Sequence, residues 1–322
     1  MNSKQNLNLA ILRANIFTPG YGGRWGLPVL LWGDPGIGKT AGVSCQARDA
    51  GLDGCEGLIG STLDPADIGG YPVPDPSDAR FVRPLLPAFV RRLEAFERGG
   101  LLLIDELTTV PPLVQAALLG VALDGRIGHY KLDPRIRIIA AANPVELAVN
   151  GTPLAPPTSN RFCHLTWQNV DLDVWADILR GDHLTVAPID AAEREAAVLA
   201  AWPEAFENAL ALVHGFLSRK PELRQVTPLP GDDSPAWPSS RTWEFAVRVL
   251  ASAKIHGLTE DARDLWLAGT VGGGAAVEFA AWLRDADLPD PRALLDGTAT
   301  WEIVAHRPDR TSAVLASVLA VI

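Results

Sequence analysis

Residues 33–40 have the sequence GDPGIGKT, which fits the phosphate-binding pattern G-x-x-x-x-G-K-[ST]. In this pattern, glycines let the backbone N–H groups of a turn and a helix N-terminus approach anionic oxygens closely. The Lys39 ammonium can reach the β- and γ-phosphates of a nucleotide, and the Thr40 hydroxyl can bind Mg²⁺. The nucleotide contacts are therefore expected from Gly33, Asp34, Pro35, Gly36, Ile37, Gly38, Lys39 and Thr40.

An acidic pair, Asp105 and Glu106, ends the apolar run LLLIDE at residues 101–106. Open α/β sheets place their ligands at the carboxyl ends of the strands. There, Asp105 can hold Mg²⁺ largely through water molecules, and Glu106 is a candidate base that polarises a water for attack on a phosphate. The alternative interpretation of the pair is a solvated acidic turn. The position of the acidic pair, after an aliphatic strand and downstream of a phosphate loop, favours hydrolysis of the nucleotide over binding alone.

Three further polar residues are candidates for the same site. Asn143 ends the run IRIIAAAN at 136–143, where its amide could bond both an attacking water and a terminal phosphate, although Asn-Pro after a strand is also a common turn. Arg161 precedes the run FCHLTW and could be an arginine finger for a neighbouring subunit or part of a surface ion pair. Arg241 lies near a predicted helix start, where a cation is unfavourable unless an anion is close.

Strand-like and helix-like segments alternate from about residue 27 to 167, and residues 1–167 are the predicted nucleotide-binding α/β domain. Near-continuous apolar strands between helices indicate a parallel sheet that is covered on both faces. A helix is expected at 111–125, which begins with prolines and ends in Asp-Gly. Two turn-rich stretches interrupt the alternation, a long loop or hairpin at 67–86 and a hairpin at 124–135. The expected strands occupy residues 28–32, 55–62, 101–106, 136–143 and 162–167.

Strand signals nearly vanish in the rest of the chain, residues 168–322, which is predicted to be an all-helical domain. Its segments have helical periodicity, and a Pro-rich linker at 224–240 separates them into two groups. Most of the tryptophans lie in this half, where packing between helices is favoured over an aromatic binding platform. The expected helical segments are 170–181, 190–202, 205–219, 241–257 and 275–286.

The composition limits the classes of partner. The chain of 322 residues has a formal net charge of −10, which argues against a role centred on nucleic acid, because such proteins usually have a basic surface. Its 3 cysteines are an odd number without metal-ligand spacing, so no disulfide framework is expected. We expect a cytoplasmic protein without a membrane segment, because neither a signal peptide nor an apolar run of roughly 20 residues is evident.

In this order and at these spacings, the motifs resemble those of AAA+ ATPases, and more narrowly those of the MoxR branch and its dynein-related relatives. The resemblance extends over roughly residues 25–250. Two positions depart from the branch, namely Ala142 and Asn160, where its members often carry a polar and an acidic residue. The resemblance implies that residues 33–40 form Walker A, that Asp105 and Glu106 form Walker B, that Asn143 is sensor 1, that Arg161 is the arginine finger and that Arg241 is sensor 2.

The resemblance further implies a parallel-sheet P-loop AAA+ core followed by a C-terminal all-helical lid domain. Such proteins bind ATP and Mg²⁺, hydrolyse ATP, and form homo-oligomeric rings, often hexameric, that remodel partner proteins. Proteins with a von Willebrand factor A domain are common partners of the MoxR branch. Three other functions stay open: a nucleic-acid-directed AAA+ motor like a restriction-system NTPase subunit, with Arg80 and Arg83 facing phosphates in a pore, a small-molecule kinase, and a nucleotide-dependent scaffold.

Overall fold

A computed structural model of the protein describes residues 3–148, 151–169, 172–180, 189–228, 234–286, 289, 291–301 and 307–319. The chain divides into two compact units, Met1–Glu195 and Ala196–Ile322. The predicted domain boundary lies earlier, after residue 167, where the hydrophobic pattern changes. The described residues between this boundary and Glu195 belong to the first compact unit. The assignment of 1–167 and 168–322 as functional domains stays a prediction. Each unit is described by itself.

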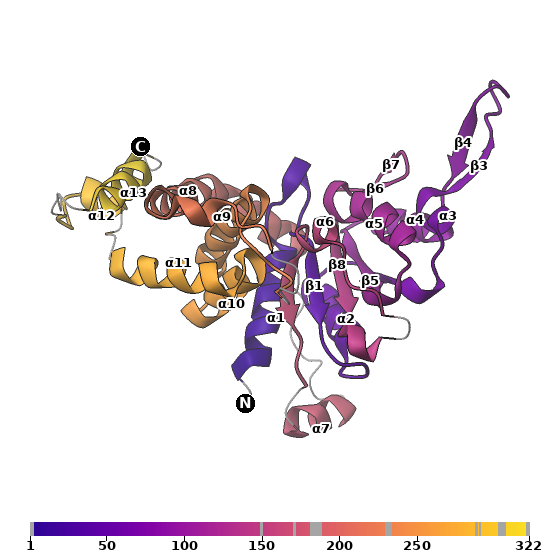
Figure 1. Ribbon diagram of the computed structural model, residues 1–322, viewed down its shortest axis with the longest axis horizontal. Helices are drawn as coiled ribbons and strands as arrows, with labels where there is room; N and C mark the ends of the chain where they lie inside the picture. Colours follow the sequence, from indigo (N-terminus) through magenta and orange to yellow (C-terminus); the bar gives the residue numbers. More distant parts are fainter. Residues whose placement is uncertain are drawn as a thin grey trace. The chain divides into compact units, whose positions relative to one another are not determined.

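The first unit is built on a parallel sheet of five strands in the order β2-β5-β8-β1-β9 (Figure 1). The central strands β5 and β8 are buried over nearly their whole length, as the continuous apolar runs predict. Because β8 lies between β1 and β5, the segments that follow these three strands meet at one edge of the sheet. The strand bounds are Val29–Trp32 for β1, Cys55–Ile59 for β2, Gly100–Asp105 for β5, Ile136–Ala142 for β8 and Cys163–Thr166 for β9.

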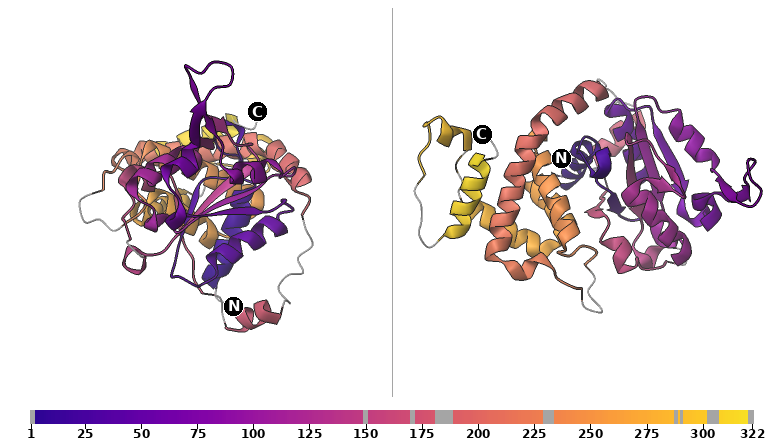
Figure 2. Two further views of the ribbon diagram at one scale, coloured as in Figure 1. Left: turned by 90° about the vertical axis from the view of Figure 1, so that its right-hand side faces the viewer. Right: turned by 90° about the horizontal axis from the view of Figure 1, so that it is seen from above.

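Helices cover both faces of this sheet (Figure 2). Apolar side chains of α4 and α5 form a buried cluster with Leu30 of β1 and Leu102 of β5. Helix α5 ends as expected at Gly125, whose φ of 59° lies in the left-handed region that glycine tolerates. The helices of this unit are α1 (Ser3–Ile16), α2 (Lys39–Asp49), α3 (Pro65–Gly69), α4 (Ala88–Glu94), α5 (Pro112–Asp124), α6 (Pro156–Ser159) and α7 (Leu172–Arg180).

Both turn-rich stretches are hairpins. Strands β3 (Tyr71–Pro74) and β4 (Val82–Leu85) pair in antiparallel register and project away from the sheet (Figure 1). Strands β6 (Arg126–Ile127) and β7 (Tyr130–Lys131) form a shorter pair. For residues 67–86 the sequence left a long loop or a hairpin open, and the structure shows a hairpin.

The second unit is helical in its described part. Four aromatic side chains from three helices pack together in it, with ring centroids of Phe216 and Phe279 4.9 Å apart and Trp243 and Trp282 against them. Trp243 and Trp282 thus serve as packing residues, as the sequence favours. The helices are α8 (Ala191–Arg219, which begins in the first unit), α9 (Ser240–His256), α10 (Glu260–Val271), α11 (Gly273–Ala286), α12 (Pro291–Leu295) and α13 (Pro308–Leu319).

Helix α8 differs from the sequence expectation. Residues 190–202 and 205–219 form one helix of 29 residues that continues through Pro203. A proline removes one helical hydrogen bond but does not end a helix that is held by packing on both sides of it. Among the described helices, α8 alone has the length and hydropathy of a possible membrane span, a property that long helices of soluble proteins share. The predicted linker at 224–240 lies partly outside the described residues.

A buried cation connects three segments of the first unit. The side chain of Arg137 in β8 is 1% exposed. Its guanidinium donates to the carbonyl oxygens of Ile16 (3.0 Å) and Arg135 (2.6 Å) and forms an ion pair with Glu195 in the first turns of α8. Burial lowers the pKa of Arg137, and the carboxylate of Glu195 opposes that shift. The ion pair therefore compensates a charge that the core would otherwise leave without a counter-ion.

We expect Glu195→Gln to lower the free energy of unfolding by about 3–5 kcal/mol, because breaking a buried ion pair leaves the guanidinium charge uncompensated. Glu193→Gln, two residues away with an exposed side chain, serves as the matched control. Urea denaturation followed by tryptophan fluorescence measures both variants. Equal losses in the two variants would show that the pair contributes nothing specific.

Candidate nucleotide-binding site

The loop at residues 33–38 connects β1 to α2 and contains glycines of two kinds. Gly36 and Gly38 have φ angles of 80° and 82°, and no atom lies within 4 Å of the positions that their Cβ atoms would take. At Gly33, a Cβ would come within 2.9 Å of the Trp167 carbonyl oxygen. One glycine thus allows the loop to pack on the core, and two others leave an open backbone surface at the N-terminus of α2.

Lys39 is the first residue of α2, and its side chain turns back into the loop. Its ammonium donates to the carbonyl oxygens of Gly33 (2.7 Å) and Asp34 (2.9 Å) and to Oδ1 of Asn143 (2.8 Å). Three oxygen acceptors match the three protons of a charged ammonium. Burial lowers the pKa of Lys39, while the negative charges of Asp105 and Asp34 act in the opposite direction. The loop and the residue after β8 therefore share one cation, and the charge of Asp105 favours its protonated form.

Thr40 and Asp105 face each other across the same edge of the sheet. The Thr40 hydroxyl donates to Oδ2 of Asp105 at 2.6 Å. The other carboxylate oxygen of Asp105 accepts the backbone N–H of Glu106 at 2.8 Å. Oxygen ligands of this kind suit Mg²⁺, which binds through one or two protein groups and keeps several waters. The pair predicted as magnesium ligands is thus brought together.

Glu106 has an unusual backbone conformation. Its φ of 58° is the one positive value at a non-glycine position in the described part of the chain. Such a conformation costs on the order of 1–3 kcal/mol and is characteristic of functional sites. The carboxylate accepts a hydrogen bond from the Ser61 hydroxyl at 2.6 Å. The turn also packs tightly on Gly60, where a Cβ would lie 2.9 Å from the Glu106 carbonyl oxygen. The side chain is therefore held in one place next to Asp105.

Asn143 directly follows β8, and hydrogen bonds hold both its backbone carbonyl and its side-chain oxygen. Its backbone carbonyl accepts a hydrogen bond from the fully buried Thr108 hydroxyl (2.9 Å), and its side-chain oxygen accepts from Lys39. Thr108 lies in the short 3-10 helix Leu107–Thr109 that follows the acidic pair. The amide is thereby placed between the phosphate loop and the segment that follows the acidic pair.

Arg161 lies at the opposite end of the sheet from this site. It follows α6 and comes two residues before Cys163, which pairs with Val29 at the beginning of β1. Its guanidinium donates to the Pro157 carbonyl oxygen at 2.6 Å. Arg241 is in the first turn of α9 in the second unit. The structure of the first unit therefore brings together Lys39, Thr40, Asp105, Glu106 and Asn143, but not Arg161, and the roles of both arginines stay predictions.

Two residues that touch the site escaped the sequence analysis. Ser61 holds Glu106. Trp167 packs against the loop and against α2, because a Cβ at Gly33 would lie 2.9 Å from its carbonyl oxygen and a Cβ at Gly42 would lie 2.5 Å from its ring. Ser61 left a signal in the sequence, because it is a hydroxyl residue at the carboxyl end of a predicted strand. Strand β2 pairs with β5, so residues that follow the two strands become neighbours. Trp167 left no signal, because its role depends on β9 pairing with β1.

The residues present fit ATP and Mg²⁺. Gly36 and Gly38 leave room for phosphates next to the first N–H groups of α2, which have no partners within the helix. Lys39 supplies a cation, and Thr40 and Asp105 supply oxygen ligands for the metal. Gly33 to Thr40 would therefore hold the phosphates, and Thr40 and Asp105 would hold Mg²⁺ largely through water.

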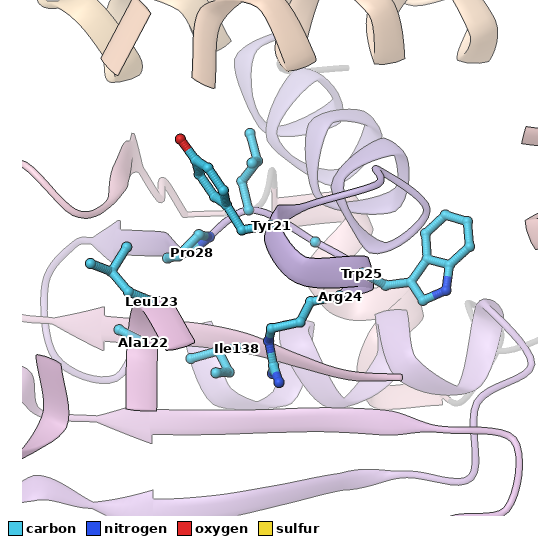
Figure 3. A pocket seen from close by; sticks show the side chains of 9 residues that line it. Tyr21, Arg24, Trp25, Pro28, Ala122, Leu123 and Ile138 are labelled. Carbon is cyan, nitrogen blue, oxygen red and sulfur yellow. The ribbon is translucent and has the colours of Figure 1, made fainter. Parts of the chain in front are cut away.

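A small cavity lies elsewhere in the first unit, away from the candidate nucleotide-binding site. It lies near the amino ends of β1 and β8 and is lined by Tyr21, Arg24, Trp25 and Ile138 among others (Figure 3). Its volume of about 20 Å³ holds roughly one water molecule. The Arg24 guanidinium is buried and donates to the carbonyl oxygen of Ile136 at 2.8 Å. This cavity is therefore a small packing defect around a structural arginine.

Comparison with known proteins supports the fold. No protein-family model matches the chain. A candidate ATPase from Cytophaga hutchinsonii, known from a crystal structure, superposes with a TM-score of 0.56 at 18% identity and covers 87% of this chain and 89% of its own. Midasin from Giardia intestinalis is 28% identical over 165 residues, which is 49% of this chain. The chain spans only 3% of the length of midasin. The fold is the expected one, an α/β core with a parallel sheet followed by a helical C-terminal region.

We expect Lys39→Ala to weaken ATP binding by a factor of about 10–100, because a hydrogen bond to a charged group contributes roughly 1.5–3 kcal/mol. Isothermal titration calorimetry measures the affinity. Lys131→Ala, which removes an exposed ammonium in β7, is the matched control and should bind as the unmodified chain does. An unchanged affinity in Lys39→Ala would contradict the assignment of the loop.

Proposed function

We propose that this protein is an ATP-hydrolysing AAA+ protein of the MoxR type that forms a ring and remodels or activates partner proteins. The observation that carries the ATPase proposal is the convergence of Lys39, Asp105, Glu106 and Asn143 at one edge of the sheet. Hydrolysis needs a phosphate site, a metal site and a base close together, and these side chains supply all three. The similarity to a candidate ATPase and to part of midasin supports the same class.

In the proposed reaction, the Glu106 carboxylate accepts a proton from a water molecule as that water attacks the γ-phosphate. The bond from the γ-phosphorus to the oxygen that bridges it to the β-phosphate breaks, and ADP and phosphate are released. Asn143 orients the water or the phosphate through its amide, and Lys39 balances the negative charge of the phosphates. Bound Mg²⁺ would neutralise charge that develops on the phosphate oxygens. The Ser61 hydroxyl donates a 2.6 Å hydrogen bond to the Glu106 carboxylate and so fixes the position of the proposed base.

We expect Glu106→Gln to reduce ATP turnover by a factor of about 10²–10⁴, because an amide cannot accept the proton of the water. ATP affinity should change little, since the phosphate loop is untouched. A phosphate-release assay and a binding titration measure the two quantities. Glu97→Gln, an exposed site outside the cluster, is the matched control. Wild-type turnover in Glu106→Gln would place the base elsewhere.

The position of Arg161 supports a role between subunits. Its level in the sheet is near the start of β1, whereas Gly33 follows the end of β1. The four residues of β1, a rise of roughly 13 Å, separate the two levels, and Arg161 comes before β9 begins. An arginine side chain does not span that distance, so Arg161 would have to act on the phosphate loop of a neighbouring copy. This geometry favours a homo-oligomeric ring, which the resemblance expects to be hexameric, over a monomeric small-molecule kinase.

We expect Arg161→Ala to retain ATP binding and to lose hydrolysis by a factor of about 10³ or more. A mixture of Arg161→Ala with Glu106→Gln should regain partial turnover, because some interfaces then combine an intact Glu106 with an intact Arg161. Each variant alone serves as the inactive control. If mixed assemblies form and stay inactive, Arg161 does not act across a subunit interface.

A protein partner is better supported than nucleic acid. The β3–β4 hairpin exposes apolar side chains, including Phe81 and Val82, which are 63% and 72% exposed. Clusters of this kind are characteristic of surfaces that bind other proteins. Arg80, an expected phosphate contact of a nucleic-acid motor, is instead paired with Asp78 at 2.6 Å. A von Willebrand factor A domain protein is the partner that the resemblance suggests. Strong stimulation of the ATPase by DNA, falling steeply with salt, would favour the motor instead.

A further inference from the structure

A buried histidine connects the end of β1, which the phosphate loop follows, to the segment that carries Arg161. His164 lies in β9 and is 6% exposed. Its Nδ1 atom is 2.9 Å from the indole nitrogen of Trp32, and its Nε2 atom is 2.9 Å from the carbonyl oxygen of Ser159. The rings of Trp32 and His164 also stack, with centroids 6.2 Å apart. One imidazole therefore touches the last residue of β1 and the last residue of α6.

The two partners fix the chemical form of the ring. An indole N–H only donates, so Nδ1 of His164 must accept, and a carbonyl only accepts, so Nε2 must donate. The ring is then neutral with its proton on Nε2, and both nitrogens are used. Burial lowers the pKa of His164 to about 4, in agreement with a neutral ring near pH 7. Only one orientation of the ring satisfies both neighbours.

The two neighbours are not held equally well. Trp32 belongs to β1, which pairs with β8 on one side and with β9 on the other, and its carbonyl accepts the Trp167 N–H at 2.6 Å. Helix α6 has four residues, Pro156–Ser159, and a helix of one turn is not stable by itself. The hydrogen bond from His164 to Ser159 is thus a tertiary support for α6. The guanidinium of Arg161 depends on α6 in turn, because it donates to the Pro157 carbonyl oxygen.

We propose that His164 is a positioning residue for the arginine finger, which orders α6 against β1 so that Arg161 is presented to the neighbouring subunit. This inference rests on the proposed function, in which Arg161 acts on the nucleotide of another copy. His164 does not touch that nucleotide; it acts through Ser159, α6 and Arg161. Loss of the imidazole should therefore impair the neighbour's active site and leave the ATP site of its own subunit intact.

The first test is the His164→Phe homomer, which keeps an aromatic ring and loses both hydrogen bonds. Turnover should fall by about 10²-fold, as expected for a catalytic group displaced by around 1 Å, while ATP affinity stays within about twofold because the loop contacts are unchanged. His164→Gln, whose amide can still donate to Ser159, should recover part of the turnover. His214→Phe, an exposed histidine replaced in α8, is the matched control and should have no effect.

The decisive test is a pair of mixtures. Mixed with Glu106→Gln, His164→Phe subunits contribute an intact Glu106 and receive an intact, well-positioned Arg161, so turnover should return. Mixed with Arg161→Ala, they meet neighbours without a finger and offer them a displaced one, so the mixture should stay inactive. If His164 acted on its own phosphate loop through Trp32, the two results would be reversed.

The reversed pattern, no recovery in either mixture, or full turnover in the His164→Phe homomer would each overturn the inference. The mixture of Glu106→Gln with Arg161→Ala is run in parallel. Its failure would overturn the interfacial role of Arg161 itself and not only the role of His164. If His164→Phe does not assemble, the same mixtures are made with His164→Asn, and failure of both variants to assemble would show that the residue serves folding alone.

Discussion

The ammonium of Lys39 joins the phosphate loop to the residue that follows β8. It donates to two carbonyl oxygens of the loop that holds it and to the side chain of Asn143, which comes from a different strand. This arrangement is possible because β8 lies between β1 and β5 in the sheet. The same strand order places Thr40 opposite Asp105. A single buried cation thus connects the phosphate loop to Asn143, and the Thr40–Asp105 hydrogen bond joins the first turn of α2 to the end of β5.

The two ends of the sheet have different roles in this account. The carboxyl ends of β1, β5 and β8 carry the residues that would bind and hydrolyse ATP, while Arg161 is level with the amino end of β9. If Arg161 is an arginine finger, it can contact a nucleotide only when a neighbouring copy brings its own phosphate loop close to it. The network of Trp32, His164 and Ser159 crosses β9 between the two ends. The proposed ring and the proposed role of His164 therefore follow from the same topology.

The sequence predicted what depends on local pattern. The phosphate loop, the acidic pair, Asn143 and the strands of the sheet follow from residue types at short spacings, and the structure places them as expected. Contacts between distant segments were not predictable. Ser61 and His164 act through partners that only strand pairing reveals, and a lone serine or histidine in an apolar run is usually a packing residue. The continuation of α8 through Pro203 was missed because packing, rather than local propensity, decides whether a proline ends a helix.

The central claim is that this chain hydrolyses ATP at the edge of the sheet where Lys39, Asp105, Glu106 and Asn143 meet. The most direct measurement is the rate of phosphate release from ATP by the purified chain, with and without Mg²⁺ and over a range of protein concentrations. We expect saturable turnover that needs Mg²⁺ and whose rate per subunit rises with protein concentration as subunits assemble. Tight binding of ATP without any phosphate release under all these conditions would contradict the central claim and would favour a nucleotide-dependent scaffold.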